Sequence, residues 1–556
     1  MSSRLLARLR IMCLACLAAL IPVSCSRNAP QPVDVQPVVG MPSGTNGYPW
    51  WNDAVFYQIF VRSFYDSNGD GNGDLKGVIE KLDYLNDGNP ETTTDLGVNA
   101  LWLLPLHPAS TYHGYDVTDY STIHPDYGML QDFQQLLDEA HRRGMRVVID
   151  LVLNHTSSEH AWFVSAGDKT SRYRSWYVWS ATEPVGAGWH KAPSGYYYGN
   201  FGDGMPDLNY ENPEVTAQMQ DVARYWLEEV GVDGFRLDAI KHLVEDGVIT
   251  ANADQTHSWL ADFRPFYKAI NPQAMTVGEV WEDSVTVSKY LKGDELDIAF
   301  DFDLAEAAIV SARTGKAAEY ARILSRDLGL FPPGQFATFL TNHDQARTML
   351  VLGENPLKAR VAAALLLTSP GVPFIYYGEE IGMIGKKPDE NIRTPMQWSA
   401  DFDAGFSSAT PWRPVNPDYP EKNVALQTGD AASLLAYYCE LVGLRNRHVA
   451  LRLGETIPLE TGHPAIYAIL RHTENESLLV VTNLSELPVA DYALSVAESP
   501  LSGAYQVARL FGTESSKRVT ITPPALDAKG GFSAYRPLAE LPPGFTLILQ
   551  LQLLER

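Results

Sequence analysis

Eight short apolar runs constrain the fold of this chain more than any other feature. They are rich in β-branched and aromatic residues, and they alternate with segments whose apolar residues recur at three- and four-residue spacing. Eight such βα units predict an α/β fold with a closed (β/α)8 barrel of the TIM type rather than an open sheet. The predicted strands are Ala54 to Phe64, Ala100 to Leu106, Arg146 to His155, Gly234 to Ala239, Met275 to Trp281, Asp297 to Leu304, Phe336 to Asp344 and Val372 to Glu380. The clearest helical segments are Met129 to Arg143, Val215 to Val230 and Pro356 to Thr368.

Two further regions interrupt or follow the barrel pattern. The long interval after the third strand predicts an inserted subdomain, whose many aromatic residues we expect to form mostly its core. Beyond Arg447, strand-like pieces separated by Pro and Gly turns predict a C-terminal antiparallel β-sandwich. The predicted division is 1–25 signal peptide, 26–47 flexible linker, 48–155 with 213–447 catalytic barrel, 156–212 inserted domain B and 448–556 β-sandwich.

The first residues predict an export signal. Three arginines within the first ten residues precede an apolar run from Ile11 to Val23, which is too short to span a bilayer comfortably. The run leads to Cys25 in a strip that resembles a bacterial lipoprotein cleavage box, except for Pro22, where an aliphatic residue is usual. We therefore expect an exported protein, either a cell-envelope lipoprotein tethered through lipidated Cys25 or a protein secreted by a plain signal peptide.

The charge of the chain excludes some partners. Its formal net charge of −24 repels nucleic acid and anionic membrane surfaces and suits a neutral substrate. Besides Cys13 and Cys16 in the apolar run of the predicted signal, the chain has only Cys25 and Cys439, so no intramolecular disulfide framework is expected. We expect a monomer that binds no nucleic acid.

Three carboxylates follow predicted barrel strands at the C-terminal ends, where barrel enzymes place their reactive groups. Asp238, Glu279 and Asp344 lie within the last three residues of the fourth, fifth and seventh runs. Glycoside hydrolysis needs two carboxyl groups flanking the scissile bond, about 5–5.5 Å apart in retaining enzymes. Any one of the three would more simply be a helix cap or a loop acceptor. Together they predict a hydrolytic site.

Neighbouring side chains indicate how the carboxyl groups divide the chemistry. Arg236 points to the same face as Asp238, so its guanidinium is expected to lower the pKa of Asp238 and keep a nucleophile ionised. Glu279 is expected to stay protonated near neutral pH because of neighbouring carboxylates, to protonate the leaving oxygen and then to activate water. Asp344 can bind sugar hydroxyls more strongly in the transition state.

These strips resemble the α-amylase family, glycoside hydrolase family 13. Four strips at strand ends and a fifth, Met205 to Asn209, match the signature regions of the family in order, and the resemblance covers about Trp51 to the C-terminus. The strand-end strips are Asp150 to His155, Gly234 to Asp238, Gly278 to Trp281 and Thr341 to Asp344. It implies Asp238 as nucleophile, Glu279 as acid/base and Asp344 as transition-state stabiliser. It also implies contacts to the sugar being cleaved, by stacking from Tyr115 and by hydrogen bonds from His155, Arg236 and His343.

The position within the family is less sharply defined. Lys241 and His242 resemble the pair with which endo-acting amylases hold glucose units beyond the cleavage point, whereas Asp116 and Arg393 resemble the pair that closes the pocket of oligosaccharide α-glucosidases. The strip from Met205 to Asn209 is similar to the subfamily intermediate between oligo-1,6-glucosidases and neopullulanases, which includes lipoprotein α-amylases. We expect retaining, mainly endo-acting cleavage of α-1,4 bonds in starch and maltooligosaccharides, with some transglycosylation.

Two other classes of function stay open. One is an exo-acting α-glucosidase, an oligo-1,6-glucosidase or a glucanotransferase, which shares the chemistry and differs in its products. The other is a non-catalytic carbohydrate-binding protein on the same scaffold, since a fold does not guarantee activity. Such relatives typically lose catalytic carboxylates, and here all three are present.

A loop before the first barrel helix predicts a calcium site. Oxygen-bearing side chains alternate with glycines, a spacing that can wrap Ca²⁺. The loop is not an EF-hand, because its twelfth position is Gly77 rather than Glu. Similar loops bind calcium in related amylases and α-glucosidases, with Asn72 acting through its carbonyl, and a metal-free Asx-turn loop is the alternative. Asn154 and the carbonyl of His242 resemble a second amylase calcium site. The predicted loop ligands are Asp66, Asn68, Asp70, Asn72 and Asp74.

Overall fold

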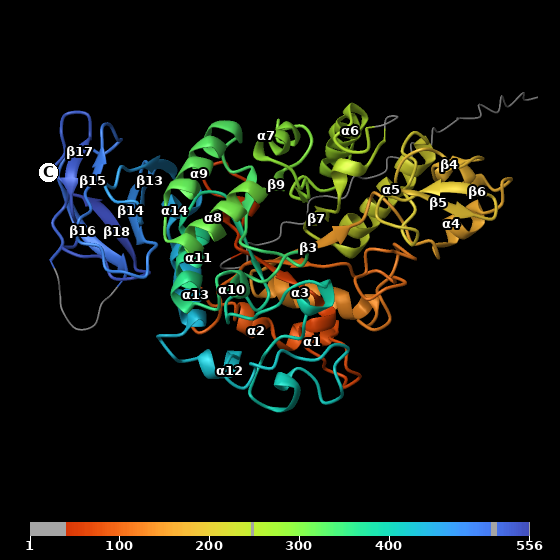
Figure 1. Ribbon diagram of the computed structural model, residues 1–556, viewed down its shortest axis with the longest axis horizontal. Coiled ribbons are helices and arrows are strands. Elements are labelled where there is room, and N and C mark those ends of the chain that lie inside the picture. Colours follow the sequence, from red (N-terminus) through yellow and green to blue (C-terminus); the bar gives the residue numbers. More distant parts are fainter. Residues whose placement is uncertain (1–40, 246–248, 513–519, 555–556) are drawn as a thin grey trace, which may run out of the picture. The chain divides into compact units, whose positions relative to one another are not determined.

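The computed structural model describes residues 41–245, 249–512 and 520–554. At its centre eight parallel strands close into a barrel in the order β1-β11-β10-β9-β8-β7-β3-β2 (Figure 1). Each strand lies within one predicted run, so the (β/α)8 prediction is confirmed. The strands are β1 Phe56–Ile59, β2 Ala100–Leu103, β3 Arg146–Leu151, β7 Gly234–Leu237, β8 Met275–Gly278, β9 Ile298–Phe300, β10 Phe336–Thr338 and β11 Val372–Tyr376.

The inside of the barrel is packed with aromatic side chains. The rings of Phe56 and Phe374 stack with centroids 4.3 Å apart, and Phe300 lies 5.0 Å from Phe374 and 5.4 Å from Trp102. Nearly all strand residues are buried, which is why the strands read as continuous apolar runs rather than as alternating ones. The barrel is therefore a solid core that holds its strand ends in fixed positions.

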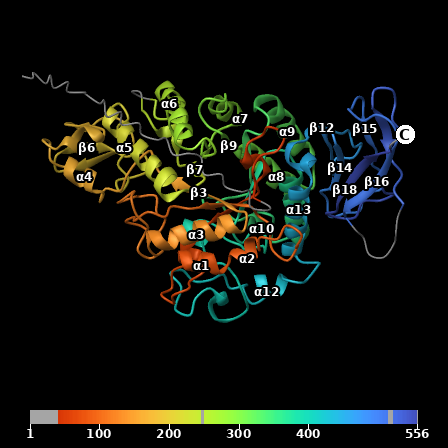
Figure 2. The same ribbon diagram turned by 180° about the vertical axis from the view of Figure 1, so that it is seen from behind.

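Helices cover the outside of the barrel (Figure 2). Two of the three clearest helical predictions correspond to single helices, α3 Leu130–Arg142 and α11 Pro356–Thr368. The third differs, because α5 Pro213–Arg224 continues as a π-helix, Tyr225–Val230, around buried Trp226, whose indole N–H donates to the carbonyl of Tyr120. The other helices of three turns or more are α6 Asp254–Ile270, α8 Phe302–Thr314, α9 Ala318–Leu330 and α13 Leu434–Arg447.

The insert after β3 has its own small antiparallel sheet of β4 Trp179–Ser180, β6 Gly195–Tyr198 and β5 Trp189–Ala192, preceded by helix α4 Ala161–Ala166. Its aromatic residues mostly pack on one another. Phe163, for example, stacks on Trp179 with centroids 5.6 Å apart. The insert is thus held together by aromatic packing, without a disulfide.

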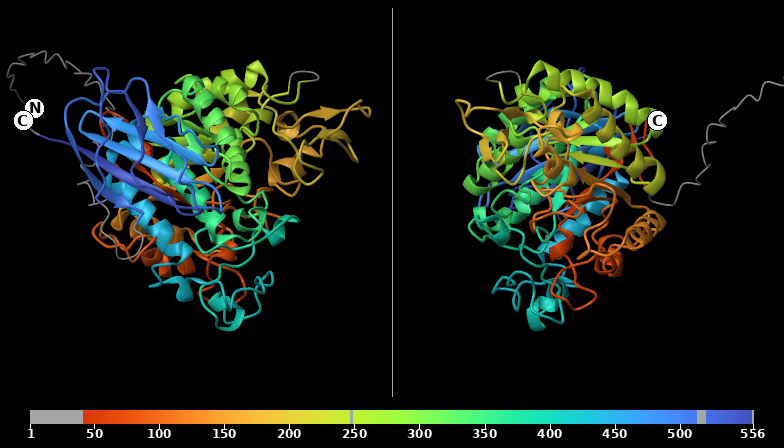
Figure 3. Two further views of the ribbon diagram at one scale, coloured as in Figure 1. Left: turned by 60° about the vertical axis from the view of Figure 1, so that its left-hand side comes forward. Right: turned by 90° about the vertical axis from the view of Figure 1, so that its right-hand side faces the viewer.

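The C-terminal region is a five-stranded antiparallel sheet with a second, two-stranded one, as predicted (Figure 3). Along β13 the side chains alternate: Tyr467 and Ile469 pack with the core of the barrel region, and Ala468 and Leu470 pack in a separate core between the two sheets. The strands are β12 Glu455–Pro458, β13 Ile466–Thr473, β14 Glu476–Asn483, β15 Leu494–Val496, β16 Tyr505–Phe511, β17 Phe532–Tyr535 and β18 Thr546–Leu553.

The predicted signal peptide, Cys25 and most of the predicted linker lie outside the described residues. Residues 41–47 of that linker contact the barrel, because Arg146 donates to the carbonyl of Pro42 and the Thr45 hydroxyl donates to Asp53 at 2.8 Å. Within the described ranges, no helix combines the length and apolarity needed to cross a bilayer. Cys439 is a free thiol.

Candidate active site

Neighbouring strands bring Asp238 and Glu279 side by side. Leu237 and Gly278 pair in the register of β7 and β8, and the two carboxylates are the residues that follow them. The Glu279 N–H donates to the carbonyl of Leu237 at 3.0 Å, which continues the pairing beyond the strands. Since adjacent strands lie about 4.7–4.9 Å apart, this placement suits the carboxyl separation of a retaining glycosidase.

A buried guanidinium links these carboxylates. Arg236, 1% exposed, reaches Asp150 Oδ1 at 2.5 Å and Asp238 Oδ1 at 2.7 Å through one terminal nitrogen. Its other terminal nitrogen lies 2.9 Å from Glu279 Oε2. One positive charge therefore faces three carboxyl groups, which favours retention of a proton on at least one of them.

Each of the two neighbouring carboxyls keeps one oxygen for a ligand. Among the described residues, no hydrogen bond or ion pair uses Asp238 Oδ2 or Glu279 Oε1, and the side chains are 10% and 13% exposed. Glu279 Oε2 is fixed from two sides, since it also accepts from the N–H of Ala239 at 2.9 Å. The free oxygens are thus the ones that can meet a substrate.

The protonation of the two carboxyls differs in part from the sequence prediction. Burial raises the pKa of Glu279 to about 7; Arg236 opposes this effect, and Asp238 and Asp344 add to it. A protonated Glu279 near neutral pH therefore agrees with expectation. Burial also raises the pKa of Asp238, because it outweighs the lowering by Arg236. The expected lowering below the ordinary value was wrong in its net direction, since sequence spacing reports the guanidinium but not the desolvation.

Asp344 is held on both oxygens. Oδ1 accepts from Arg393 at 2.9 Å, and Oδ2 lies 3.0 Å from His343 Nε2. The same ring nitrogen lies 2.6 Å from the Tyr115 hydroxyl, and Gln58 donates to Nδ1 at 2.6 Å. Burial lowers the pKa of His343, with Arg393 adding to the effect, so the ring is neutral and Gln58 leaves Nε2 as its N–H donor.

Two further predicted sugar contacts lie beside this group. Tyr115 also accepts a 3.3 Å hydrogen bond from Arg236, which ties the ring to the carboxylate group. His155 is buried, and its Nε2 has no hydrogen-bond partner in the described part of the chain. Its ring lies 5.4 Å from that of Phe201, an aromatic residue that is 41% exposed. An unsatisfied ring nitrogen suits a ligand hydroxyl.

The predicted endo-amylase pair lies next to Glu279. Lys241 donates to the Trp281 carbonyl at 2.9 Å and to Glu282 at 2.8 Å, and His242 Nδ1 donates to the Thr250 carbonyl. Trp281 is 45% exposed, and its ring stacks on Phe302 at 4.7 Å. Trp281 was not among the predicted site residues, although an exposed ring two residues after Glu279 is a flat surface for a sugar.

The two predicted pocket-closing residues have different hydrogen-bond partners in the structure. Asp116 is buried and accepts from the backbone and hydroxyl of Thr111, whereas Arg393 donates to Asp344 and to the carbonyl of His343. No hydrogen bond or ion pair links Asp116 to Arg393. The two residues lie in the same region as separate supports of the Tyr115 loop and of Asp344.

Two contacts were missed by the sequence analysis. Asp150 was seen only as the start of a strand-end strip, yet it is fully buried between Arg236 and the indole N–H of Trp102. Burial raises its pKa to about 7, against the opposing effect of Arg236. Gln58, on β1, fixes His343, which follows β10, the second strand from β1 in the barrel. Their inward position on strands was the available signal, but their partners lie on other strands.

The predicted calcium loop is closed largely by its own N–H groups. Asp66 accepts from the backbone of Asn68, Gly69 and Gly71, and Asp74 caps helix α1 Leu75–Glu80 by accepting from Gly77. Asn72 accepts from Arg62, and Asp70 and Asn68 are exposed. Asp66 and Asp74 are buried without an ion pair to any described residue.

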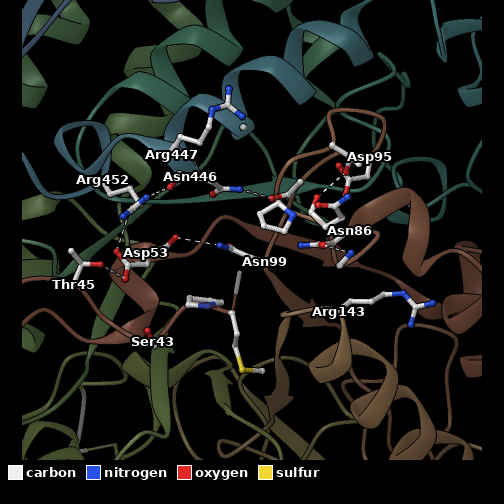
Figure 4. Close-up of a pocket in the computed structure, with 18 residues that line it drawn as sticks. Ser43, Thr45, Asp53, Asn86, Asp95, Asn99, Arg143, Asn446, Arg447 and Arg452 are labelled. Carbon is white, nitrogen blue, oxygen red and sulfur yellow. Dashed lines mark hydrogen bonds and ion pairs between the residues drawn. The ribbon is translucent and has the colours of Figure 1, made fainter. Parts of the chain in front are cut away.

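A polar cavity of about 290 Å³ lies at the opposite end of the barrel strands (Figure 4). Asp53, Asn99 and Arg143 line it from positions that precede β1, β2 and β3, and Arg452 pairs with Asp53 at 3.0 Å. It contains none of the predicted site residues. Polar groups at this end of a barrel generally serve stability rather than chemistry.

A closed (β/α)8 barrel with three carboxylates at the C-terminal ends of its strands, two of them on one arginine, defines a barrel glycoside hydrolase. The family follows from the comparisons. The model of the α-amylase catalytic domain matches residues 58–454. The chain belongs to the α-amylase family, glycoside hydrolase family 13.

Its relatives cover several activities. The chain is 41% identical to alpha-amylase 3 of Dictyoglomus thermophilum over 453 residues, which cover 80% of this chain and 87% of that protein. It is 34% identical to the oligo-1,6-glucosidase of Heyndrickxia coagulans, covering 79% and 93%, and 35% identical to the trehalose synthase/amylase TreS of Mycolicibacterium smegmatis, covering 81% and 86%. The crystal structure of the α-amylase from H. orenii matches with a TM-score of 0.78 at 41% identity, over 90% of this chain and 99% of that one.

Proposed function

We propose that this glycoside hydrolase cleaves α-1,4-glucosidic bonds in starch and maltooligosaccharides with retention of configuration, mainly within chains and with some transglycosylation. The observation that carries the proposal is the pair Asp238 and Glu279 on one buried Arg236, each with a free oxygen, one with a pKa of about 7. That is the arrangement that a nucleophile and an acid/base require.

In the proposed mechanism, Asp238 Oδ2 attacks C1 of the bound glucosyl unit while Glu279 Oε1 gives its proton to the departing glycosidic oxygen. The C1–O bond to the leaving sugar breaks, and a covalent glycosyl ester on Asp238 forms. Glu279, now ionised, removes a proton from water, whose oxygen attacks C1 and frees Asp238. If a sugar hydroxyl takes the place of water, the same steps give transglycosylation.

Other residues hold the sugar during both steps. Asp344, fixed by Arg393 and His343, is placed to bind hydroxyls of the cleaved unit, and Tyr115 to stack on its ring. His155 Nε2 is a further hydrogen-bonding group without a partner in the described chain. Lys241 and exposed Trp281 lie beyond Glu279, where a leaving or accepting sugar would bind.

Two observations bear on endo action. The similarity to two α-amylases and the Lys241 pair beside Trp281 support binding of sugars on both sides of the cleavage point. The relatives that carry the names oligo-1,6-glucosidase and trehalose synthase favour the second candidate, an exo-acting α-glucosidase or a glucanotransferase.

Product analysis separates these activities. With long amylose, the proposed enzyme releases maltooligosaccharides of several lengths in the first minutes, together with products longer than the substrate when maltotriose is supplied. Chromatography of timed samples on amylose, pullulan and maltotriose measures both. Glucose as the sole early product from amylose would overturn the endo assignment.

We also propose that Ca²⁺ binds the loop from Asp66 to Asp74. Two buried carboxylates without a basic partner fit a cation in charge, with Asn68, Asp70 and the Asn72 carbonyl completing the donors. The fit is incomplete, because the loop N–H groups already bind these carboxylates and no three His, Cys, Asp or Glu side chains of the described chain form a metal-binding group. Near Asn154, the side chains of Asp207 and Glu245 share a hydrogen bond, and the buried Asn154 Oδ1 has no partner in the described chain, a group of oxygens that suits a second cation.

Removal of calcium is expected to lower the melting temperature, because a ligand that binds only the folded state stabilises it. Calorimetric scans with EGTA, and again with excess Ca²⁺, measure the shift. Asp70→Ala removes an exposed carboxylate whose one hydrogen bond within the described residues comes from the Asn72 N–H, and it should reduce the response if the loop is the site. An identical melting temperature with and without chelator argues against bound calcium.

We propose that the chain is exported and tethered to the cell envelope through lipidated Cys25, with plain secretion as the alternative. The support is the sequence of the first 25 residues, which lie outside the described part. Labelled fatty acid should be incorporated into the wild-type protein in cells and not into Cys25→Ser. Equal labelling of the two proteins would exclude this anchor.

A further inference from the structure

A cavity of about 820 Å³ lies in the insert, against the loop that follows β7. Its walls carry the aromatic residues of the small sheet together with polar groups. The residues that line the cavity include Tyr177, Trp179, Trp189, Tyr198, Asn200 and Thr250. None of the predicted catalytic or sugar-contacting residues lines it, so it is separate from the carboxylate site.

The aromatic wall has the chemistry of a sugar platform. Trp189 and Tyr198 face each other across paired strands, with ring centroids 5.4 Å apart, and both line the cavity. Trp189 is only half-buried, although it belongs to a subdomain whose other aromatic residues mostly form a core. Flat apolar rings that stay open to a cavity match the apolar faces of glucose units.

Polar groups without partners complete the wall. The side-chain amide of Asn200 makes no hydrogen bond to any described residue. The backbone N–H of Asn200 donates to Asp207 Oδ1. The buried indole N–H of Trp179 also lacks an acceptor in the described ranges. The Asn200 amide is therefore free to bond a sugar hydroxyl in the cavity.

The cavity adjoins the acceptor side of the active site. Thr250 lines the cavity, and its carbonyl accepts the 2.7 Å hydrogen bond from His242 Nδ1. His242 belongs to the pair beyond the cleavage point, and its ring lies 5.5 Å from Phe201. A chain bound in the cavity would therefore lie behind the loop that carries Lys241 and His242.

We propose that this cavity is a second, non-catalytic binding site for a segment of α-glucan, which holds long chains near the acceptor side of the carboxylate site. The inference rests on the proposed α-glucan activity. The neutral substrate suits the walls, because they carry five aromatic side chains and two amides, and the charged groups Arg174, Glu211 and Glu245 are of both signs. A chain that reaches both sites gains from effective concentration, whereas a short one does not.

The test is a calorimetric titration of maltoheptaose into full-length Asp238→Asn protein, alone and combined with Trp189→Ala. The Asp238→Asn protein, the parent in this comparison, should show two binding sites. The double variant with Trp189→Ala should show one site, or a second site whose Kd is about three- to tenfold larger. Trp189→Phe should retain most of the binding. Tyr505→Ala, which truncates a half-buried ring of the C-terminal sheet, is the matched control and should bind like the parent.

Kinetics with Asp238 intact give an independent result. Trp189→Ala should lower kcat/KM on amylose by about three- to tenfold and leave kcat/KM on maltotriose unchanged. If Trp189→Ala does not fold, as judged by circular dichroism, Asn200→Ala tests the same cavity without removing a ring. The proposal is overturned if both variants bind maltoheptaose and cleave amylose as the parent does. Binding in the cavity by a wild-type protein that cleaves no α-glucan would instead refute the proposed function and leave the site standing.

Discussion

Asp238→Asn is expected to lower kcat on maltooligosaccharides by about four orders of magnitude or more while maltoheptaose still binds. The substitution keeps the shape of the side chain but replaces an ionised oxygen that can attack C1 by an amide that cannot. Arg236 keeps Asp150 and Glu279 as partners, so the folded site should survive. Steady-state kinetics and calorimetric binding on the same preparation measure both effects.

Asp283→Asn is the matched control. Asp283 lies four residues beyond Glu279, is exposed, and caps helix α7 Ser284–Val287 by accepting from Thr286, a role that asparagine also fills. It should keep near-wild-type activity. If Asp238→Asn retains more than about a tenth of wild-type kcat, the covalent mechanism at this residue fails.

The barrel itself could be predicted from the sequence because its information is local. Every strand is a short apolar run bounded by turns, and strand ends of one direction must share one mouth. That is enough to bring Asp238, Glu279 and Asp344 together. The interruption of the second predicted helix by a π-helix at Tyr225 had no local signal, since it depends on packing of Trp226 against the Tyr120 segment.

The electrostatics of the site could not be predicted from spacing, because they depend on depth and on partners from distant strands. Arg236 stands two residues from Asp238 in sequence, yet it divides its charge among Asp238, Asp150 and Glu279. Burial then determines the sign of the Asp238 shift. Spacing also does not show that Arg393 donates to Asp344, because these two residues lie in different loops of the sequence.

The shared guanidinium has a consequence for how the two carboxyls work together. Because Arg236 is fully buried and fixed by three carboxyl groups, it stabilises the ionised form of each without moving. When Asp238 becomes an ester, it loses its negative charge and no longer raises the pKa of Glu279. The lowering of that pKa by Arg236 is then less opposed, which favours the ionised Glu279 that must activate water. The same cation thus supports both halves of the reaction.

Glu279→Gln is expected to lower kcat on maltooligosaccharides by about two to four orders of magnitude and to remove the alkaline limb of the pH profile. Glu279 must be protonated to act as the acid, and its pKa is about 7, so wild-type kcat/KM should fall by about tenfold per pH unit above that value. Asp238 must be ionised, and its raised pKa moves the acid limb of the pH profile above the ordinary range of aspartate, which narrows the pH optimum.

Chemical rescue tests the same role of Glu279. With an aryl maltoside whose leaving group needs no proton, Glu279→Gln should still form the ester. Azide, which needs no base, should then restore turnover by forming the glycosyl azide. Glu282→Gln, which alters a neighbouring glutamate bonded to Lys241, should keep the wild-type profile. An alkaline limb that stays in place in Glu279→Gln, or no rescue by azide, would assign the proton transfer to another group.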